Sequence, residues 1–343
     1  MKDSKYLWAY FGPLSVVAGI YFGSVWSFGF VYVAFLILPI IEIFTPIDKT
    51  NAPEKSEDAR AKTYFFDVLV YSHVPILYGI LFYALYKATH TPLTTLETVG
   101  LVLNVGVFIG AFGINVAHEL GHREKKSEQL LARALLLPAL YTHFTIEHNR
   151  GHHKNVATDL DPSSARYNEN VYAFWLRSVF GVYFEAWQIS NADMKRDGLS
   201  VFSFKNDMIR ATLYQIIYVV AVFLVFGFNG LLLALLMGAT GFLLLETVNY
   251  IEHYGLRRKT LPNGKFENVL PQHSWNSEHA MGRIFLYELT RHSDHHFKAN
   301  RKYQILRHHE EAPELPVGYP AAMLMALVPP LWFSVMNKKI IRE

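Results

Sequence analysis

The sequence of 343 residues contains no cysteine. That absence excludes disulfides, iron–sulfur clusters, zinc ribbons and thiolate-ligated haem. Charged residues are also scarce, at 18% of the chain against 51% hydrophobic and 15% aromatic residues. Because the mean hydropathy is positive, at +0.15, the composition predicts a membrane protein in contact with lipid. The formal net charge is only +3, and we expect no nucleic-acid partner.

The apolar residues gather in six long runs. A helix needs about 17 to 25 apolar residues to cross the hydrocarbon core of a membrane. Six segments approach that length: Tyr6–Phe22, Val25–Phe44, Tyr64–Tyr86, Val99–Ala117, Thr212–Phe228 and Leu231–Tyr250. Short turns separate the first and the third pair, at Gly23-Ser24 and Asn229-Gly230. We therefore expect an all-α integral membrane fold of six transmembrane helices in three hairpins, with a helical, histidine-rich cytoplasmic cap.

Basic residues flank these runs and predict their orientation. Lys5 precedes the first run, whereas Arg257, Arg258 and Lys259 follow the sixth. The positive-inside rule then places both termini in the cytoplasm. We expect the spans to lie in a bacterial inner membrane. The expected organisation is membrane helices one to four in residues 1–117, a cytoplasmic segment in 118–209, helices five and six in 210–250, and a cytoplasmic C-terminal segment in 251–343.

Nine of the sixteen histidines fall into a pattern typical of metal ligands. They are His118, His122, His148, His152, His153, His253, His292, His295 and His296. Residues three or four apart share one face of a helix, so each cluster is predicted to aim its imidazoles at one ion. Imidazole without thiolate suits iron, copper, nickel or zinc. Since an ion takes about four to six ligands, nine nitrogens predict two neighbouring ions.

The clusters follow the fourth and sixth spans, so they are expected at the cytoplasmic end of the bundle, above a cavity that an apolar molecule enters from the membrane. Ligating histidines usually donate their second ring proton to a carboxylate. Glu119, Glu147, Glu252 and Asp294 are the candidates for that role. Bulky residues on the spans, such as Trp26, Phe30 or Phe108, are of the type that would end such a cavity.

The histidine pattern is also compatible with other functions. His118-Glu119-Leu120-Gly121-His122 matches the H-E-x-x-H motif of zinc metalloproteases, which makes an intramembrane protease a rival hypothesis. A single zinc ion would leave most of the clustered histidines without a role. A metal transporter would need polar groups along the spans, and beyond Asp67 and His73 the outer halves are apolar.

The spacing of the clusters resembles the histidine-box superfamily of integral-membrane di-iron enzymes, which includes desaturases and hydroxylases. The surrounding sequence resembles membrane-bound alkane 1-monooxygenases in four elements: NVAHELGH at Asn115–His122, EHNRGHH at Glu147–His153, NYIEHYG at Asn249–Gly255 and LTRHSDHH at Leu289–His296. The third element, with its extra histidine, favours an alkane hydroxylase over a fatty-acid desaturase, which is the alternative.

The resemblance implies that the nine histidines bind two non-haem iron ions. It also implies that the enzyme uses dioxygen to hydroxylate the terminal carbon of a straight-chain alkane to a primary alcohol. In this family the electrons come from rubredoxin, which a rubredoxin reductase reduces with NADH. The chain has no C-x2-C pair and no nucleotide-binding fingerprint, so we expect a separate donor.

Overall fold

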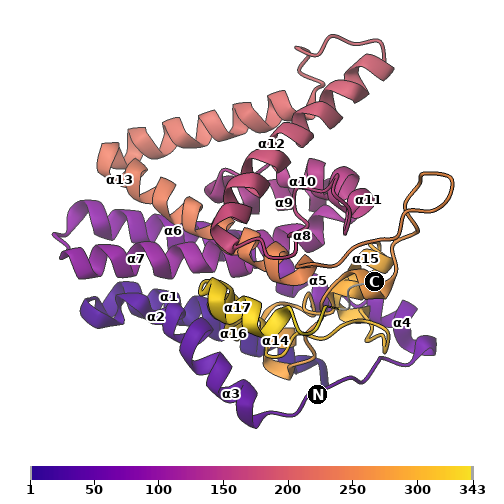
Figure 1. The fold of residues 1–343 in the computed structure, drawn as a ribbon. Coiled ribbons are helices and arrows are strands. Elements are labelled where there is room, and N and C mark those ends of the chain that lie inside the picture. The colour runs from indigo at the N-terminus through magenta and orange to yellow at the C-terminus, as the bar shows by residue number, and fades with distance from the viewer. Residues whose placement is uncertain (1, 341–343) are drawn as a thin grey trace.

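The computed structural model describes residues 2 to 340, and these form an all-helical protein without any strand beyond isolated β-bridges (Figure 1). The first residue and the last three, with which the predicted segments 1–117 and 251–343 begin and end, lie outside the described residues. The all-α prediction is therefore confirmed for the described part of the chain.

Within residues 2–340, four helical stretches are long and apolar enough to cross a membrane, which agrees with an integral membrane protein. The first, Ser24–Phe44, contains α2 (Gly29–Tyr32) and α3 (Leu38–Phe44). The second, Tyr64–His90, joins α5 (Tyr64–Tyr71) to α6 (His73–His90). The third, Thr95–Gly121, joins α7 (Thr95–Phe108) to α8 (Asn115–Gly121) through a π-helical stretch. The fourth is α13 (Asp207–His253).

The first predicted span has a composite structure. Lys2–Tyr10 forms a 3-10 helix, and α1 (Phe11–Phe22) continues it for 12 residues. The chain then turns at Gly23 and Ser24, which both have positive φ angles of 66° and 49°. The short turn predicted at this point is confirmed, because the next helical stretch begins directly after it.

The two predicted C-terminal spans form one long element, α13, which folds back on itself at its far end (Figure 1). The reversal lies at Gly227, whose φ of 68° and ψ of −171° are not helical. The turn predicted at Asn229-Gly230 is therefore wrong. Glycine fits this position because it has no Cβ to clash at positive φ, whereas Asn229 and Gly230 are helical.

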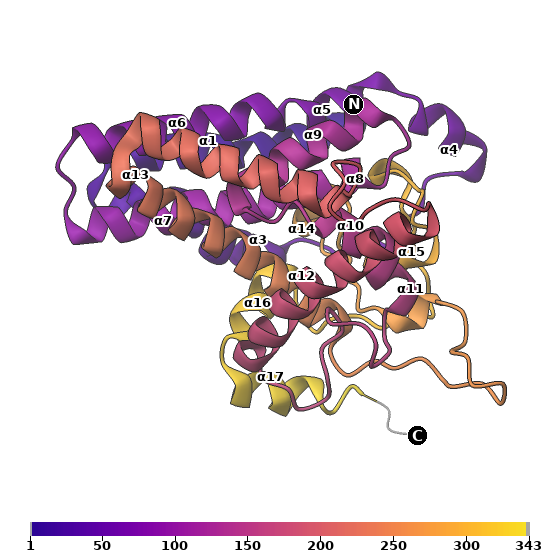
Figure 2. The same cartoon turned by 90° about the horizontal axis from the view of Figure 1, so that it is seen from above.

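The remaining helices gather mostly at one end of the bundle, as Figure 2 shows for α8, α10, α11 and α15. They are α4 (Glu54–Ala61), α9 (Lys126–Leu136), α10 (Phe144–Glu147), α11 (His153–Asn155), α12 (Val171–Arg196), α14 (Ala280–Phe285) and α15 (His292–Phe297). The membrane-length helices thus extend in one direction from a compact cap, and this cap contains most of the histidines.

The C-terminal helices α16 (Tyr319–Ala326) and α17 (Pro329–Met336) are bent against each other by 120°. Tyr319 and Trp332 are buried in one cluster with Tyr250 and Tyr254, which lie at the end of α13. The rings of Tyr250 and Trp332 are 5.4 Å apart. This pair of helices therefore packs against the C-terminal end of α13, on both sides of His253.

Candidate metal centre

The structure brings all nine predicted histidines together, in two adjoining groups. The five-histidine group consists of His118, His122, His148, His153 and His295. The four-histidine group consists of His152, His253, His292 and His296. Within each group one ring nitrogen of every residue lies within 4.8 Å of all the others. Five helical segments of the chain meet here: the end of α8, the π-helical stretch His148–His152, α11, the end of α13, and α15.

The nitrogens of the five-histidine group face one another rather than separate partners. The Nε2 atom of His118 is 2.7 Å from that of His148 and 2.9 Å from that of His295. The Nε2 atom of His153 is 3.1 Å from that of His148 and 3.0 Å from that of His295. A neutral imidazole nitrogen either donates one N–H or offers one lone pair, so five converging Nε2 atoms cannot all be paired by N–H···N hydrogen bonds. A cation among them would accept their lone pairs together, and the donor set therefore fits a metal ion.

The four-histidine group is entirely buried. The Nε2 atom of His292 lies 3.1 Å from that of His253 and 2.9 Å from that of His296. The Nε2 atom of His152 is buried and has no hydrogen-bond partner within residues 2–340. Because a buried polar atom without a partner is costly, this orphaned nitrogen also fits a bound metal ion.

The environment favours the protonation state that binds metals. Burial lowers the pKa of His122 to about 3, with a further contribution from the neighbouring His152. Burial, followed by repulsion from adjacent imidazoles, likewise holds the pKa values of His148, His292 and His295 well below the ordinary value. These rings are neutral near pH 7, and neutral imidazole is the metal ligand.

The two groups cut across the clusters seen in the sequence. His148 and His153 belong to the five-histidine group, whereas His152 between them belongs to the other. The prediction that each cluster serves one ion is therefore wrong. Consecutive residues of a helix point about 100° apart, so adjacent histidines such as His152 and His153 face different histidine groups.

Two of the predicted carboxylates lie close to the ligands in sequence but make other contacts. Glu119 accepts hydrogen bonds from the guanidinium of Arg123, at 3.0 Å, and from the backbone N–H of Tyr303, at 3.1 Å. Glu147 is buried, and its Oε1 atom has no hydrogen-bond partner in the described part of the chain. Burial, with Asp161 and other carboxylates nearby, holds the pKa of Glu147 well above its usual range.

Asp294 also serves the loop that follows its helix. Its carboxylate accepts hydrogen bonds from Arg301 at 2.9 Å, from the ring of His309 at 2.7 Å and from the backbone N–H of Arg307 at 2.9 Å. These contacts tie residues 301 to 309 to α15. The imidazole that Asp294 contacts thus belongs to His309, which lies outside both histidine groups, and the contacts of Asp294 fix this loop.

Glu252 lies closer to the centre than predicted. Its Oε2 atom is 3.2 Å from Nε2 of His292, the nitrogen that faces the four-histidine group. Its Oε1 atom accepts a hydrogen bond of 2.9 Å from the hydroxyl of Tyr319. The carboxylate thus lies on the side of His292 where an ion would be held.

Asp161 is the carboxylate that sequence reasoning missed. It accepts a hydrogen bond of 2.9 Å from Nδ1 of His152, and Ser164 and the backbone N–H of Ser163 bond to the same carboxylate at 2.5 and 2.9 Å. This arrangement fixes the tautomer of His152 and leaves its Nε2 atom free to face the other members of the four-histidine group. The Asp-Pro-Ser-Ser turn could have pointed to Asp161, because aspartate commonly bonds to the backbone two residues on.

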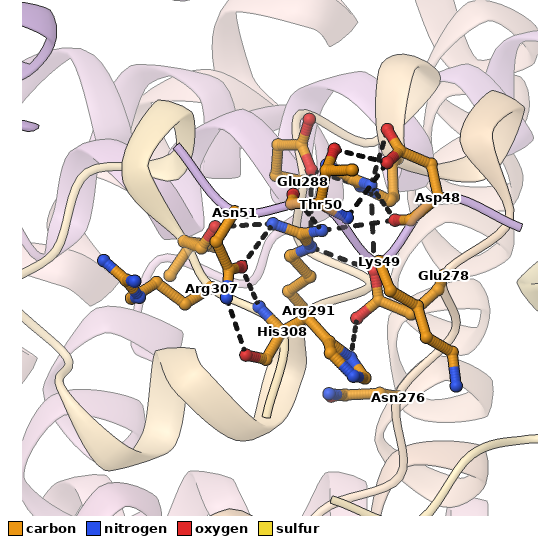
Figure 3. A network of polar contacts seen from close by, with 12 residues as sticks. Asp48, Lys49, Thr50, Asn51, Asn276, Glu278, Glu288, Arg291, Arg307 and His308 are labelled. Carbon is orange, nitrogen blue, oxygen red and sulfur yellow. Dashed lines mark hydrogen bonds and ion pairs between the residues drawn. The ribbon is translucent and has the colours of Figure 1, made fainter. Parts of the chain in front are cut away.

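Buried ion pairs fix the segment that carries the last three histidines. Arg291 directly precedes His292, is 2% exposed, and lies at the centre of the polar contacts in Figure 3. It donates to Glu278 at 3.0 Å and to the backbone carbonyls of Thr50 and Leu306 at 3.0 and 2.9 Å. The loop after α3 and the segment around α15 are thereby held together.

An apolar cavity adjoins both histidine groups. It is lined by His118, His148 and His292 on one side and by α13 residues such as Leu244 and Val248 on another. A second cavity shares four lining residues with the first: Ala111, Leu244, Leu286 and Met323. The second cavity leads away from the histidines into the bundle.

The three bulky residues proposed to limit the cavity differ in position. Phe30 lines the second cavity, together with Phe112. Phe108 is fully buried, and its ring is 6.1 Å from that of Phe30. Trp26 is 61% exposed on the outside of the bundle and does not line either cavity.

Membrane-length helices, two adjoining histidine groups and an apolar cavity beside them together place the protein in the class of membrane proteins with histidine boxes. The fatty acid desaturase family matches residues 96 to 324 of this chain. The chain is 38% identical to alkane 1-monooxygenase 2 of Pseudomonas aeruginosa, over 92% of its own length and 85% of that protein. It is 35% identical to alkane 1-monooxygenase of Ectopseudomonas oleovorans, over 99% and 86%.

A more distant similarity, of 26% identity over 95% of the chain, links it to the xylene/toluene monooxygenase hydroxylase component of Pseudomonas putida. The higher identity to the first two relatives, at similar coverage, decides the subgroup. The chain belongs to the alkane 1-monooxygenase family.

Proposed function

We propose that the protein hydroxylates the terminal carbon of straight-chain alkanes, yielding primary alcohols, at a pair of iron ions held by the nine histidines. The observation that carries the proposal is the apolar cavity that opens onto His118, His148 and His292. Family membership narrows the reaction to the one that gives the relatives their name.

The reaction balances with an external source of electrons. An alkane and dioxygen, with two electrons and two protons, give one alcohol and one water. A pair of iron ions at the histidines would supply the reductive activation of dioxygen. The five-histidine group would hold one ion and the four-histidine group the other.

The protein positions the substrate and excludes water from it. The walls of the two cavities are formed mainly by aliphatic and aromatic side chains, which would hold a hydrocarbon chain and exclude water from the reacting methyl group. A chain lying along Leu244 and Ala111 toward Phe30 would present its end to the histidines. Terminal selectivity then follows from the shape of the cavity.

The expected surroundings complete the proposal. We infer six spans, with segments 1–117 and 210–250 in the bacterial inner membrane, and segments 118–209 and 251–343 with both termini in the cytoplasm. The continuous element α13, reversed at Gly227, supplies two of the spans. Rubredoxin, reduced by its reductase with NADH, would deliver the electrons from the cytoplasmic side, since the chain has no cysteine to hold a redox cluster.

Product analysis tests the function. Membranes containing the protein are supplied with a medium-chain n-alkane, oxygen-18 gas, rubredoxin, rubredoxin reductase and NADH. We expect labelled 1-alkanol, detected by gas chromatography and mass spectrometry, and its loss in His292→Ala. An alkene formed in an acyl chain would favour the desaturase alternative. An iron-loaded protein that forms no oxygenated product from any chain length would overturn the proposal.

A further inference from the structure

The two histidine groups offer unequal numbers of imidazoles, five and four, and a carboxylate lies beside the smaller group. Glu252 precedes His253 on α13 and is 1% exposed. Its Oε2 atom lies 3.2 Å from Nε2 of His292, and that nitrogen lies 3.1 Å from Nε2 of His253. Donor atoms bound side by side to one ion at about 2.1 Å are separated by about 3 Å. The carboxylate oxygen therefore lies at the separation expected of a donor bound next to His292, on the side of that ring that faces the smaller group, although it is not within 4.8 Å of the donor atoms of all four histidines.

The other oxygen of Glu252 fixes this orientation. The hydroxyl of Tyr319 donates to Oε1 at 2.9 Å, and Tyr319 is itself fully buried at the start of α16. Each oxygen of the carboxylate thus has a different neighbour: Tyr319 holds one, and the four-histidine group faces the other. A buried carboxylate with a single neutral donor on one oxygen is costly unless a cation balances its charge.

Neighbouring carboxylates do not share this position. Asp161 contacts His152 through Nδ1, on the side of the ring away from the group. Glu246, one turn and a half earlier on α13, is bonded to Tyr141 at 2.7 Å and to Ser178 at 2.5 Å. Among the described residues, Glu252 is the carboxylate that contacts a ligand through its Nε2 atom.

We propose that Glu252 is a direct ligand of the ion in the four-histidine group, and that Tyr319 of the C-terminal helix pair is the residue that positions it. The inference rests on the proposed di-iron site. With Glu252 as a ligand, each group has five donors. The ion in the five-histidine group would have imidazole ligands alone, whereas the ion in the four-histidine group would also have one negatively charged carboxylate ligand. The assignment also gives the bent pair α16 and α17 a part in the metal site.

Iron content and Mössbauer spectra of protein loaded with iron-57 test the assignment without relying on turnover. In Glu252→Gln, which keeps the shape but removes the charge, we expect the affinity for one of the two ions to fall at least about tenfold, the lower end for partners beyond the ligands themselves. One spectral component should change and the other should remain. Tyr319→Phe should change the same component, with a smaller loss of affinity.

Tyr250→Phe is the matched control, because it removes a buried tyrosine hydroxyl that bonds to the carbonyl of Glu169 instead. It should leave both components unchanged. If Glu252→Gln fails to fold, Tyr319→Phe and Glu252→Asp, which retains the carboxylate on a shorter stem, carry the test on the same spectra. Two ions bound with native affinity and unaltered spectra in the variants of Glu252 and Tyr319 would overturn the ligand assignment.

These outcomes separate the two proposals. A wild-type protein that binds two ions with one component sensitive to Glu252, but forms no alcohol, supports the ligand and contradicts the proposed function. If the wild-type protein forms alcohol but substitution of Glu252 changes neither spectral component, the result supports the proposed function and contradicts the ligand assignment.

Discussion

The five-histidine and four-histidine groups are built from the same side chain but lie in different surroundings. Two members of the first, His122 and His153, are partly exposed, whereas all four of the second are buried. The second group also has two carboxylates beside it, Asp161 behind His152 and Glu252 beside His292. The difference indicates that depth in the cap and nearby negative charge, rather than the number of imidazoles, distinguish the two sites.

Removing one ligand from each group should have the largest effect. His295→Ala takes a nitrogen from the five-histidine group, and His292→Ala takes one from the four-histidine group. Each is expected to lower alkane hydroxylation by more than about 100-fold, the upper end for residues that only support ligands. Hydroxylation rates and iron per chain measure the effect. A variant of either group that retained full activity would contradict the requirement for both sites.

A change that acts on both groups at once comes next. Arg291 holds the segment from which His295 enters one group and His292 and His296 the other. Arg291→Met leaves the buried Glu278 without this partner, which should lower the free energy of unfolding by about 3–5 kcal/mol. Thermal unfolding in detergent measures the loss.

Arg196→Met is the matched control for that experiment, since Arg196 is also ion-paired, at 3.1 Å to Asp193, but its side chain is 70% exposed. Its effect should be at most about 1 kcal/mol. Equal losses in both variants would indicate that the buried contacts of Arg291 add nothing to stability.

Asp161→Asn tests the four-histidine group alone, with a smaller expected effect. The carboxylate orients His152, and loss of such a partner typically costs 10–100-fold in metal affinity or activity. Asp159→Asn is the control, because Asp159 lies in the same turn, is 82% exposed and pairs with Arg257 at 3.5 Å. Titration with iron in the presence of a competing chelator checks whether only one ion is weakened. Equal weakening of both ions would remove the distinction between the groups.

The sequence was sufficient to choose the nine histidines, because the clusters have helical spacing and follow long apolar runs. It was not sufficient to divide them, since His148, His152 and His153 reach two different histidine groups through a π-helical stretch that the residue pattern does not predict. The carboxylates were harder still. Asp161 reaches His152 by a turn, and Tyr319 reaches Glu252 from a segment 67 residues further along the chain.

The apolar runs predicted the presence of the membrane-length helices better than the positions at which these helices begin and end. The chain reverses at Gly227 because a positive φ angle favours glycine there, although Asn229-Gly230 has the more usual composition of a turn. The first run begins as a 3-10 helix, Lys2–Tyr10, which hydropathy does not distinguish from an α-helix. Local backbone geometry thus accounts for both differences.

A buried histidine outside both groups provides the reference for their acid sensitivity. His143 packs between the rings of Tyr141 and Tyr183, at 4.4 and 5.3 Å, and burial lowers its pKa to about 3. Its unfolded pKa is about 6.5. The folded state therefore binds fewer protons, and the stability that His143 contributes is complete above pH 6.5 and is lost as the pH falls toward 3. At pH 5 the loss is about 2 kcal/mol.

His143→Phe keeps a ring between the two tyrosines and removes the titration, so iron-loaded protein carrying it should lose less stability between pH 7 and pH 5 than the wild type. Thermal unfolding at the two pH values measures the difference, with His90→Phe, at an exposed histidine, as the control. A wild-type protein and a His143→Phe variant with the same dependence on pH would show that acid acts elsewhere. The partly exposed five-histidine group would then be the first place to examine, because protons reach His122 and His153 more readily than the buried four-histidine group.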